Sequence, residues 1–431
     1  MNSLTDMELT RFFFAIVLLL LFSHTFGFLL NRLKLPRVIG EIFGGLLLGP
    51  TALGYFFPNA YTWLFSAFES EGKLISLMSW LGLILLMFIS GFEIEKSLDR
   101  EDRKIILVLI IGSTVLPFVA GWVAPSVYDF TPYLGVKNNI VALQLVIAIA
   151  TAITSIPVIS KIFMDLGVMN TRFAKIVLSI ATIHDVLLWI VLAVATGLVS
   201  AETPSIWQIT SSIILTIVFF GLTLFLMPRV MLTLIRSRYN LLIRSSISGY
   251  VLFVCFLFAA IASLLSVNVV FGALLAGIVI GLMPRKFLRP AKNNVKDFSL
   301  ALFVPLYFAI VGLKLDFVHN FEPLFFLFFL AFTTLFQLLG TVLSAKLLKT
   351  DWLSSFNLGV AMSTRGGPGI VLATVAFDLG IINEVFFVTL VSIAIVTSLF
   401  AGTWFKYVLT KGWQLLNDSR DLSPSTQGET K

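Results

Sequence analysis

His184 and Asp185 are neighbours within an apolar segment that runs from about residue 172 to 199. Insertion scales put the cost of one charged side chain at the centre of a membrane at roughly 2.5 to 3.5 kcal/mol. A carboxylate placed there at that cost can bind a cation or a proton, although it can also serve only to pack helices together. The pair therefore predicts a site for ion or proton chemistry.

The histidine has three interpretations. His184 could bond to a neighbouring helix, titrate together with Asp185, or ligate an ion. Adjacent residues on a helix point about 100° apart, so the two side chains need not touch. An intramembrane enzyme that uses the pair is an alternative from another functional class. It would also need a nucleophile or a set of metal ligands, and the sequence has no H-E-x-x-H or G-x-S-x-G motif.

The composition is that of a multi-pass membrane protein. Of the 431 residues, 58% are hydrophobic and only 12% are charged, whereas a soluble domain carries roughly 25% charged residues. The single cysteine, Cys255, offers neither a disulfide framework nor a metal cluster. We therefore predict an all-α membrane protein without a cofactor.

Thirteen hydrophobic segments can be delimited, most of them near the roughly 20 residues that a helix needs to cross a bilayer. Their approximate bounds are 12–31, 37–55, 74–92, 104–123, 139–163, 172–199, 206–228, 245–266, 267–284, 298–318, 323–348, 353–379 and 384–409. The N-terminal segment is too long for a secretory signal, and we expect it to be retained. We expect a short solvated cytoplasmic tail over 412–431.

Lys and Arg concentrate in alternate connections between these segments. The positive-inside rule then places the N-terminus outside and the C-terminus in the cytoplasm of a cell membrane, which requires an odd number of spans. The net charge of +7 is thereby explained by topology, so it predicts no nucleic-acid partner.

Two of the segments contain helix-breaking and polar residues at their centres. The fifth contains Thr151, Thr154, Ser155 and Pro157, and the twelfth contains Ser363, Thr364, Arg365 and the stretch 366–369. A membrane tolerates the freed backbone groups only where protein or a water-filled cavity satisfies them. We expect both segments to be unwound, over 151–157 and 363–369, and to cross near Asp185.

The two breaks occupy matching places in the two halves of the chain, which predicts an inverted repeat. In this scheme one transmembrane domain covers 1–411, with repeat one at about 12–199, a linker helix at about 206–228 and repeat two at about 245–409. Asp185, Thr151 and Arg365 are then at one depth. A carboxylate that binds either a monovalent cation or a proton, with hydroxyl and carbonyl oxygens nearby, couples the two by competition.

Seven stretches resemble the monovalent cation:proton antiporter-2 family and cover about 36–400 of the chain. They are PRVIGEIFGGLLLGPTALG, LGLILLMFISGFEIE, TAITSIPVISKIFMDLG, HDVLLW, VFGALLAGIVIG, PLYFAIVGLKLDF and AMSTRGGPGIVLATVAFDLGIINEVFFVTLV. The resemblance implies two crossed, unwound helices in a core domain, a dimerisation domain and an elevator-like movement. On matching positions it implies Asp185 as the ion and proton carboxylate, with Thr151, Thr154 and Ser155 nearby.

Two positions depart from the family pattern. Relatives commonly have Asp or Asn where this chain has His184, and they often have Lys or Arg near Gln337. With no titratable base at Gln337, we predict that one cation exchanges for one proton without net charge movement. We assign structural or gating roles to Arg365 and Glu41.

The predicted function is antiport of Na⁺ or K⁺ against H⁺ by a membrane-embedded homodimer. The alternative within transport is a potassium-efflux or channel-like protein, which the lack of a regulatory nucleotide-binding motif disfavours.

Overall fold

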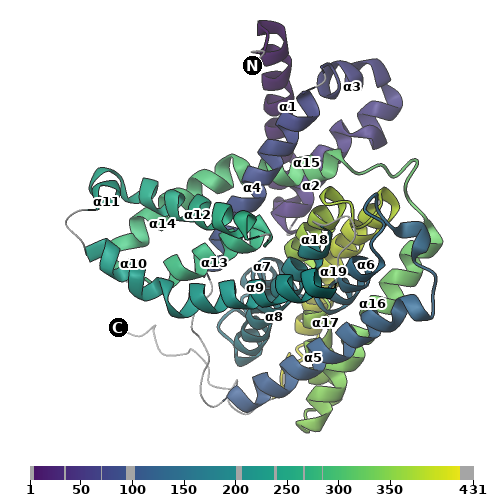
Figure 1. The fold of residues 1–431 in the computed structure, drawn as a ribbon. Helices are drawn as coiled ribbons and strands as arrows, with labels where there is room; N and C mark the ends of the chain where they lie inside the picture. Colours follow the sequence, from purple (N-terminus) through teal and green to yellow (C-terminus); the bar gives the residue numbers. More distant parts are fainter. Residues whose placement is uncertain are drawn as a thin grey trace, which may run out of the picture.

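The computed structural model describes residues 4–33, 35–68, 70–93, 102–199, 206–236, 240–265, 267–283 and 285–417, and within these ranges the chain is almost wholly helical (Figure 1). The helices are α1 (Asp6–Arg32), α2 (Arg37–Leu48), α3 (Pro58–Phe65), α4 (Glu71–Glu93), α5 (Arg103–Val123), α6 (Ile140–Ala152), α7 (Ile156–Asp165), α8 (Arg172–Val199), α9 (Ile206–Phe225), α10 (Met227–Arg236), α11 (Leu241–Ser245), α12 (Ile247–Leu264), α13 (Val269–Leu282), α14 (Arg285–Ala301), α15 (Phe303–Leu313), α16 (Pro323–Leu347), α17 (Trp352–Met362), α18 (Gly366–Asp378) and α19 (Glu384–Thr410).

Each of the thirteen predicted segments coincides with one or more of these helices. Within the described ranges, nine helical stretches are long and apolar enough to cross a membrane, or ten if the bent pair α9 and α10 is one span. Helices α2 and α13 and the two halves α17 and α18 are shorter, at 11 to 14 residues. The multi-pass helical fold is thus confirmed, whereas the count of thirteen spans is not.

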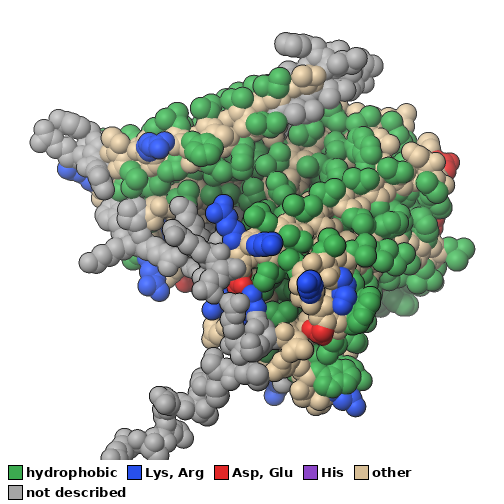
Figure 2. Space-filling view, turned by 90° about the horizontal axis from the view of Figure 1, so that it is seen from below, with side chains coloured by type: hydrophobic (Ala, Val, Ile, Leu, Met, Phe, Trp, Pro, Cys, Tyr) green, Lys and Arg blue, Asp and Glu red, His purple; other side chains and the backbone are tan. Residues whose placement is uncertain are grey.

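Large apolar side chains cover much of the exterior, and the face seen from below in Figure 2 shows Lys and Arg side chains set among hydrophobic surface. Exposed examples are Phe13, Phe28, Ile111 and Leu335. Exposed apolar surface of this extent is what a lipid environment requires and what a monomeric soluble protein avoids. The outer surface therefore agrees with the composition.

The helices pack in two groups. One comprises α1, α2, α4, α12, α13, α14 and α15, and the other comprises α5 to α8 and α16 to α19. Helix α9 packs against α8 of the second group and α13 of the first, so it bridges them. Helix α8 also packs directly against α13, and one continuous apolar core extends through both groups. Both broken segments, α6–α7 and α17–α18, belong to the second group.

Glycines let the helices of the first group approach one another closely. Gly40 and Gly44 of α2 lie against the backbone of α1, and Gly45 lies against the backbone of α15. A β-carbon at Gly45 would overlap the carbonyl oxygen of Ala309. Small residues four apart are the usual means by which membrane helices pack at short range. The GEIFGG stretch is therefore a packing motif.

We predict that Gly45→Ala destabilises the protein by about 1 to 3 kcal/mol or more, because the clashing atom belongs to backbone that cannot rotate away. Gly72→Ala is the matched control, since nothing lies within 4 Å of a β-carbon there. Thermal unfolding of both purified variants in one detergent would check this. Equal midpoints for the two variants would contradict the packing argument.

The predicted solvated tail starts later than residue 412. Leu415 and Leu416 are buried, and the carbonyl of Leu415 accepts a hydrogen bond from Asn357 Nδ2 at 3.0 Å. The backbone N–H of Asn417 donates to Ser354 Oγ at 2.8 Å. This apolar pair therefore anchors the chain against α17, and residues 418–431 lie outside the described ranges.

Candidate functional site

The fifth segment folds as two helices, α6 and α7, separated by the three residues 153–155. Pro157 lies in the first turn of α7, where a backbone N–H would have no helical partner, so its absence costs α7 nothing. The same proline cannot extend a helix that precedes it, so α6 does not continue into α7. Ser155 caps α7 through its hydroxyl. Thr151 is still helical, and its hydroxyl donates to the carbonyl of Ile147 at 2.8 Å. The break is where the sequence predicts it, but it is shorter than 151–157.

The twelfth segment is interrupted in the same way. Helix α17 ends at Met362 and α18 begins at Gly366, so the break covers 363–365 and the glycines that follow it are helical. Gly366 has a φ of +38°, and a β-carbon there would lie 2.5 Å from Ser155 Oγ. Glycine is required at this position because the two breaks meet there.

The two breaks are hydrogen-bonded to each other. The backbone N–H of Ser155 donates to the carbonyl of Thr364 at 2.6 Å. The hydroxyl of Thr154 donates to the carbonyl of Met362, also at 2.6 Å. Groups freed by one break thus satisfy groups freed by the other, as irregular backbone within a membrane requires.

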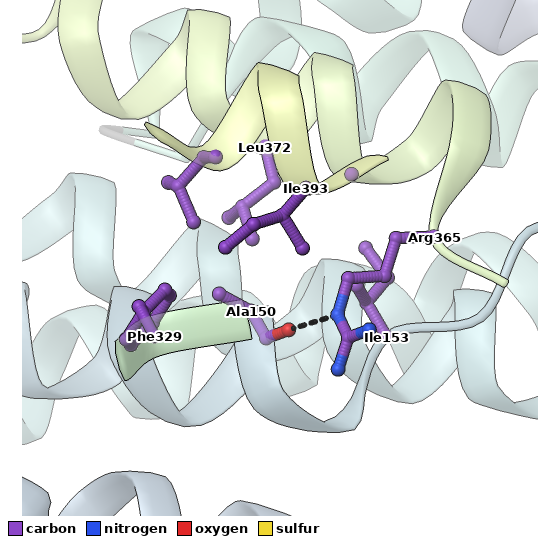
Figure 3. A pocket seen from close by; sticks show the side chains of 8 residues that line it. Ala150, Ile153, Phe329, Arg365, Leu372 and Ile393 are labelled. Atoms are coloured by element: carbon purple, nitrogen blue, oxygen red, sulfur yellow. Dashed lines mark hydrogen bonds between the residues drawn. The ribbon is translucent and has the colours of Figure 1, made fainter. Parts of the chain in front are cut away.

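Arg365 reaches back from its break to the end of α6 (Figure 3). Its Nε donates to the carbonyl of Ala150 at 3.0 Å, and its Nη1 donates to the carbonyl of Ser363 at 3.1 Å. The residue is 3% exposed, and Nη2 has no protein partner in the described part of the chain. A guanidinium beside helix-end carbonyls opposes the partial negative charge of the helix C-terminus.

A small cavity lies beside this arginine. Its other lining residues are apolar and come from α6, the first break, α16, α18 and α19: Ala150, Ile153, Phe329, Gly369, Leu372, Leu390 and Ile393. A second small cavity shares Ile153 and Leu372 and is lined by Leu188, Trp189 and Leu192 of α8. Both small spaces therefore border Ile153 of the first break, and the second, which is too small for a water molecule, lies along α8.

His184 brings α8 to the first break. Its Nδ1 lies 3.3 Å from Thr154 Oγ1, and the side chain is fully buried. Asp185 follows it within α8, so its backbone lies next to the residue that contacts the first break. The side chain of Asp185 lies outside what the structure describes. The other ring nitrogen of His184, Nε2, faces Ser113 and Thr114 of α5.

Two other predicted residues lie apart from these contacts. Glu41 belongs to the first helix group, where Oε1 pairs with Arg37 Nε at 2.9 Å. Gln337 is buried on α16, and neither polar atom of its side chain has a partner among the described residues. One turn later, Gly340 lies against Gly112 of α5. Neither Glu41 nor Gln337 forms a side-chain hydrogen bond with the described side chains of the crossing.

Ser113 and Thr114 are not among the site residues predicted from the sequence. They are adjacent hydroxyl residues in an otherwise apolar segment, four and three residues before Pro117. That pairing was the available signal, but hydroxyls are common in membrane helices because they can bond to their own helix. The contact with His184, 70 residues away along the chain, becomes visible only in the fold.

Comparisons with known proteins agree with this architecture. The family model described as "Sodium/hydrogen exchanger, transmembrane" matches residues 16–411. The chain is 28% identical to the Na(+)/H(+)-K(+) antiporter GerN of Bacillus cereus over 92% of this chain and 96% of that protein. It is 28% identical to Cation/H(+) antiporter 19 of Arabidopsis thaliana over 91% of this chain, but it spans only 49% of that protein.

The fold is similar to that of the sodium proton antiporter MjNhaP1 from Methanocaldococcus jannaschii, with a TM-score of 0.66 and 15% identity. The match covers 95% of this chain and 100% of the solved chain. The family is one of transporters, so the alternative of an intramembrane enzyme is set aside. The matched family model covers almost all of the membrane-embedded part, and the chain belongs to the sodium/hydrogen exchanger family.

Proposed function

We propose that this protein exchanges a monovalent cation, Na⁺ or K⁺, for protons across a cell membrane. The observation that carries the proposal is the pair of interlocked helix breaks beside Asp185, in a chain of the sodium/hydrogen exchanger family. The relatives that span nearly the same length are named as Na⁺/H⁺ or Na⁺/H⁺-K⁺ antiporters. A channel-like protein would instead pass cations without moving protons.

Asp185 is the group that binds cation and proton in turn. Hard oxygen ligands suit a small monovalent cation, and the hydroxyl of Thr154 in the first break contacts α8 through His184. Thr151 and Ser155 are the neighbouring hydroxyl residues along the chain. Because one carboxylate cannot hold both ligands, arrival of a cation releases a proton.

The two helix groups suit an elevator-like movement. Both breaks and Asp185 belong to the second group, which meets the first largely through apolar side chains that could slide past one another. Movement of the second group as one body would carry the site across the membrane without disturbing the bonds within the crossing. We assign the dimer interface to the first group, which would pack against the same group of a second copy.

The same scheme includes the topology. The repeats at about 12–199 and 245–409 are related by inversion, and the helix over about 206–228 is the linker. Figure 2 shows Lys and Arg side chains on one face of the molecule, and by the positive-inside rule we assign that face to the cytoplasm. The N-terminus would then lie outside and residues 412–431 inside.

The proposal is tested with purified protein in sealed proteoliposomes that contain a pH-sensitive dye. A gradient of Na⁺ or K⁺ should move protons in the opposite direction to the cation. Cation flux without any change in the internal pH would favour the channel-like alternative.

We further predict that the exchange is electroneutral, with one cation for one proton. Gln337 offers no titratable base, so Asp185 is the one group assigned to release a proton. The exchange rate should therefore stay the same when the membrane potential is clamped at different values with ionophores. A rate that varies with voltage in the wild type, but not in His184→Asn, would show that the histidine carries a second proton.

A further inference from the structure

Lys314 and Asp378 form an ion pair that joins the two helix groups. Lys314 directly follows α15 of the first group, and Asp378 is the last residue of α18 in the second. Nζ of Lys314 donates to Oδ1 of Asp378 at 2.6 Å, and both side chains are partly buried. Of the ion pairs whose two members the structure describes, this is the one that links the groups.

The turn that carries Lys314 is fixed to the first group. The hydroxyl of Thr51, just after α2, donates to the carbonyl of Leu315 at 2.7 Å. The same hydroxyl oxygen accepts from the backbone N–H of Phe317 at 3.0 Å. The ammonium of Lys314 therefore extends from a turn that moves with α2 and α15.

The turn that follows Asp378 is fixed to the second group in a similar way. The backbone N–H groups of Gly135 and Lys137, in the connection that precedes α6, donate to the carbonyls of Ile381 and Gly380 at 3.0 Å each. The carboxylate of Asp378 therefore moves with α6 and α18, and the ion pair connects two turns that are anchored separately.

The ends of the two helices explain why Asp378 needs a cation beside it. A helix C-terminus carries a partial negative charge, which opposes a carboxylate and favours a cation. Asp378 lies at such an end of α18, and Lys314 lies at the corresponding end of α15. The ammonium thus offsets the carboxylate and both helix ends, and it stabilises the arrangement in which these ends are neighbours.

We propose that Lys314 and Asp378 form a clasp that must open when the second helix group moves past the first. This inference rests on the elevator-like movement in the proposed function. Contact between apolar side chains is non-directional and can form again after a shift. An ion pair is short, and a shift of about 5 Å, one helical turn, separates its charges. In the proposed topology both helices end at the outer face, so the clasp holds the groups together there.

The clasp is tested with a reversible covalent link. In the double variant Lys314→Cys and Asp378→Cys, a bifunctional methanethiosulfonate reagent joins the two positions. The native Cys255 is buried, so it should not react. The double variant should exchange cations for protons before it is linked, lose exchange when it is linked, and regain exchange when a reductant cleaves the link.

Lys161 and Asp165 provide the matched control. Their ion pair has the same N–O distance of 2.6 Å but lies within α7, so it does not connect the groups. Cysteines linked at these two positions should leave the exchange rate unchanged. Full exchange in protein that is linked at 314 and 378 would overturn the proposal, and so would a failure of the reagent to join these positions.

Spin labels measure the movement without transport. Phe56, between α2 and α3, and Val136, before α6, are exposed and are replaced by labelled cysteines, one in each group. Lys314→Met should raise the share of a second label-to-label distance about two- to fivefold, as expected for loss of a partly exposed ion pair. Asp378→Asn should raise it less, because Lys314 still faces the helix ends.

An unchanged distance distribution in Lys314→Met would overturn the clasp. The two proposals fail separately in this experiment. A distance that shifts in Lys314→Met, in a protein whose wild type shows no exchange of cations for protons, would refute the proposed function and leave the clasp in place.

Discussion

Asp185→Asn should abolish cation-driven proton movement in proteoliposomes while the protein still folds. Asparagine keeps the size and most of the polarity of the side chain but can neither release a proton nor offer a negative charge to a cation. Burial of a neutral amide is also less costly than burial of a carboxylate, so the fold should remain at least as stable. The measurement is the rate of internal pH change after a Na⁺ or K⁺ gradient is imposed.

Asp165→Asn is the matched control for this substitution. Asp165 ends α7 and forms an ion pair with Lys161 four residues earlier, partly exposed at the surface. Pairs of this kind contribute little to stability, so Asp165→Asn should transport at the wild-type rate. Wild-type exchange in Asp185→Asn would remove the carboxylate from the mechanism.

Arg365→Ala should destabilise the protein more than any other single change considered for the crossing. Loss of the side chain leaves the carbonyls of Ala150 and Ser363 without their charged donor. Hydrogen bonds to charged groups contribute about 1.5 to 3 kcal/mol each, so we expect a loss on the order of 3 to 6 kcal/mol. The stability of Arg365→Lys should lie between those of the wild type and Arg365→Ala, because a lysine ammonium lacks the planar fork of donors that reaches both carbonyls.

The control is Arg229→Ala, which also removes an arginine bonded to a carbonyl. Nη1 of Arg229 donates to the carbonyl of Phe225 at an exposed site, where water can replace it. Denaturant or thermal unfolding in detergent should show almost no change for Arg229→Ala and a large change for Arg365→Ala. Equal stability of the two variants would mean that Arg365 does not hold the crossing together.

The position of the two breaks could be predicted from sequence because Pro157 and Gly366 act locally. Proline cannot extend the helix before it, and a run of glycines marks a place where backbones approach closely. The length of each break could not be predicted. Helix α6 continues to Ala152 because the bonds that end it are made by residues of the other break, more than 200 positions away.

The hydrogen-bond partners of the buried polar side chains could not be predicted from the sequence either. A charge at Arg365 is visible in the sequence, but its acceptors are backbone carbonyls that any residue type provides. The sequence left three interpretations open for His184, and the structure supports the bond to a neighbouring helix through Thr114. The roles of Asp185, Thr151 and Ser155 in ion binding remain predictions.

The central claim is that cation and proton compete for one carboxylate, and it is tested most directly by proton release on cation binding. Purified protein in weakly buffered detergent solution is mixed with Na⁺ or K⁺, and the protons released are counted with a pH indicator. We predict about one proton per chain for the wild type and none for Asp185→Asn. Cation binding without proton release in the wild type, or equal release from Asp185→Asn, would contradict competition at Asp185.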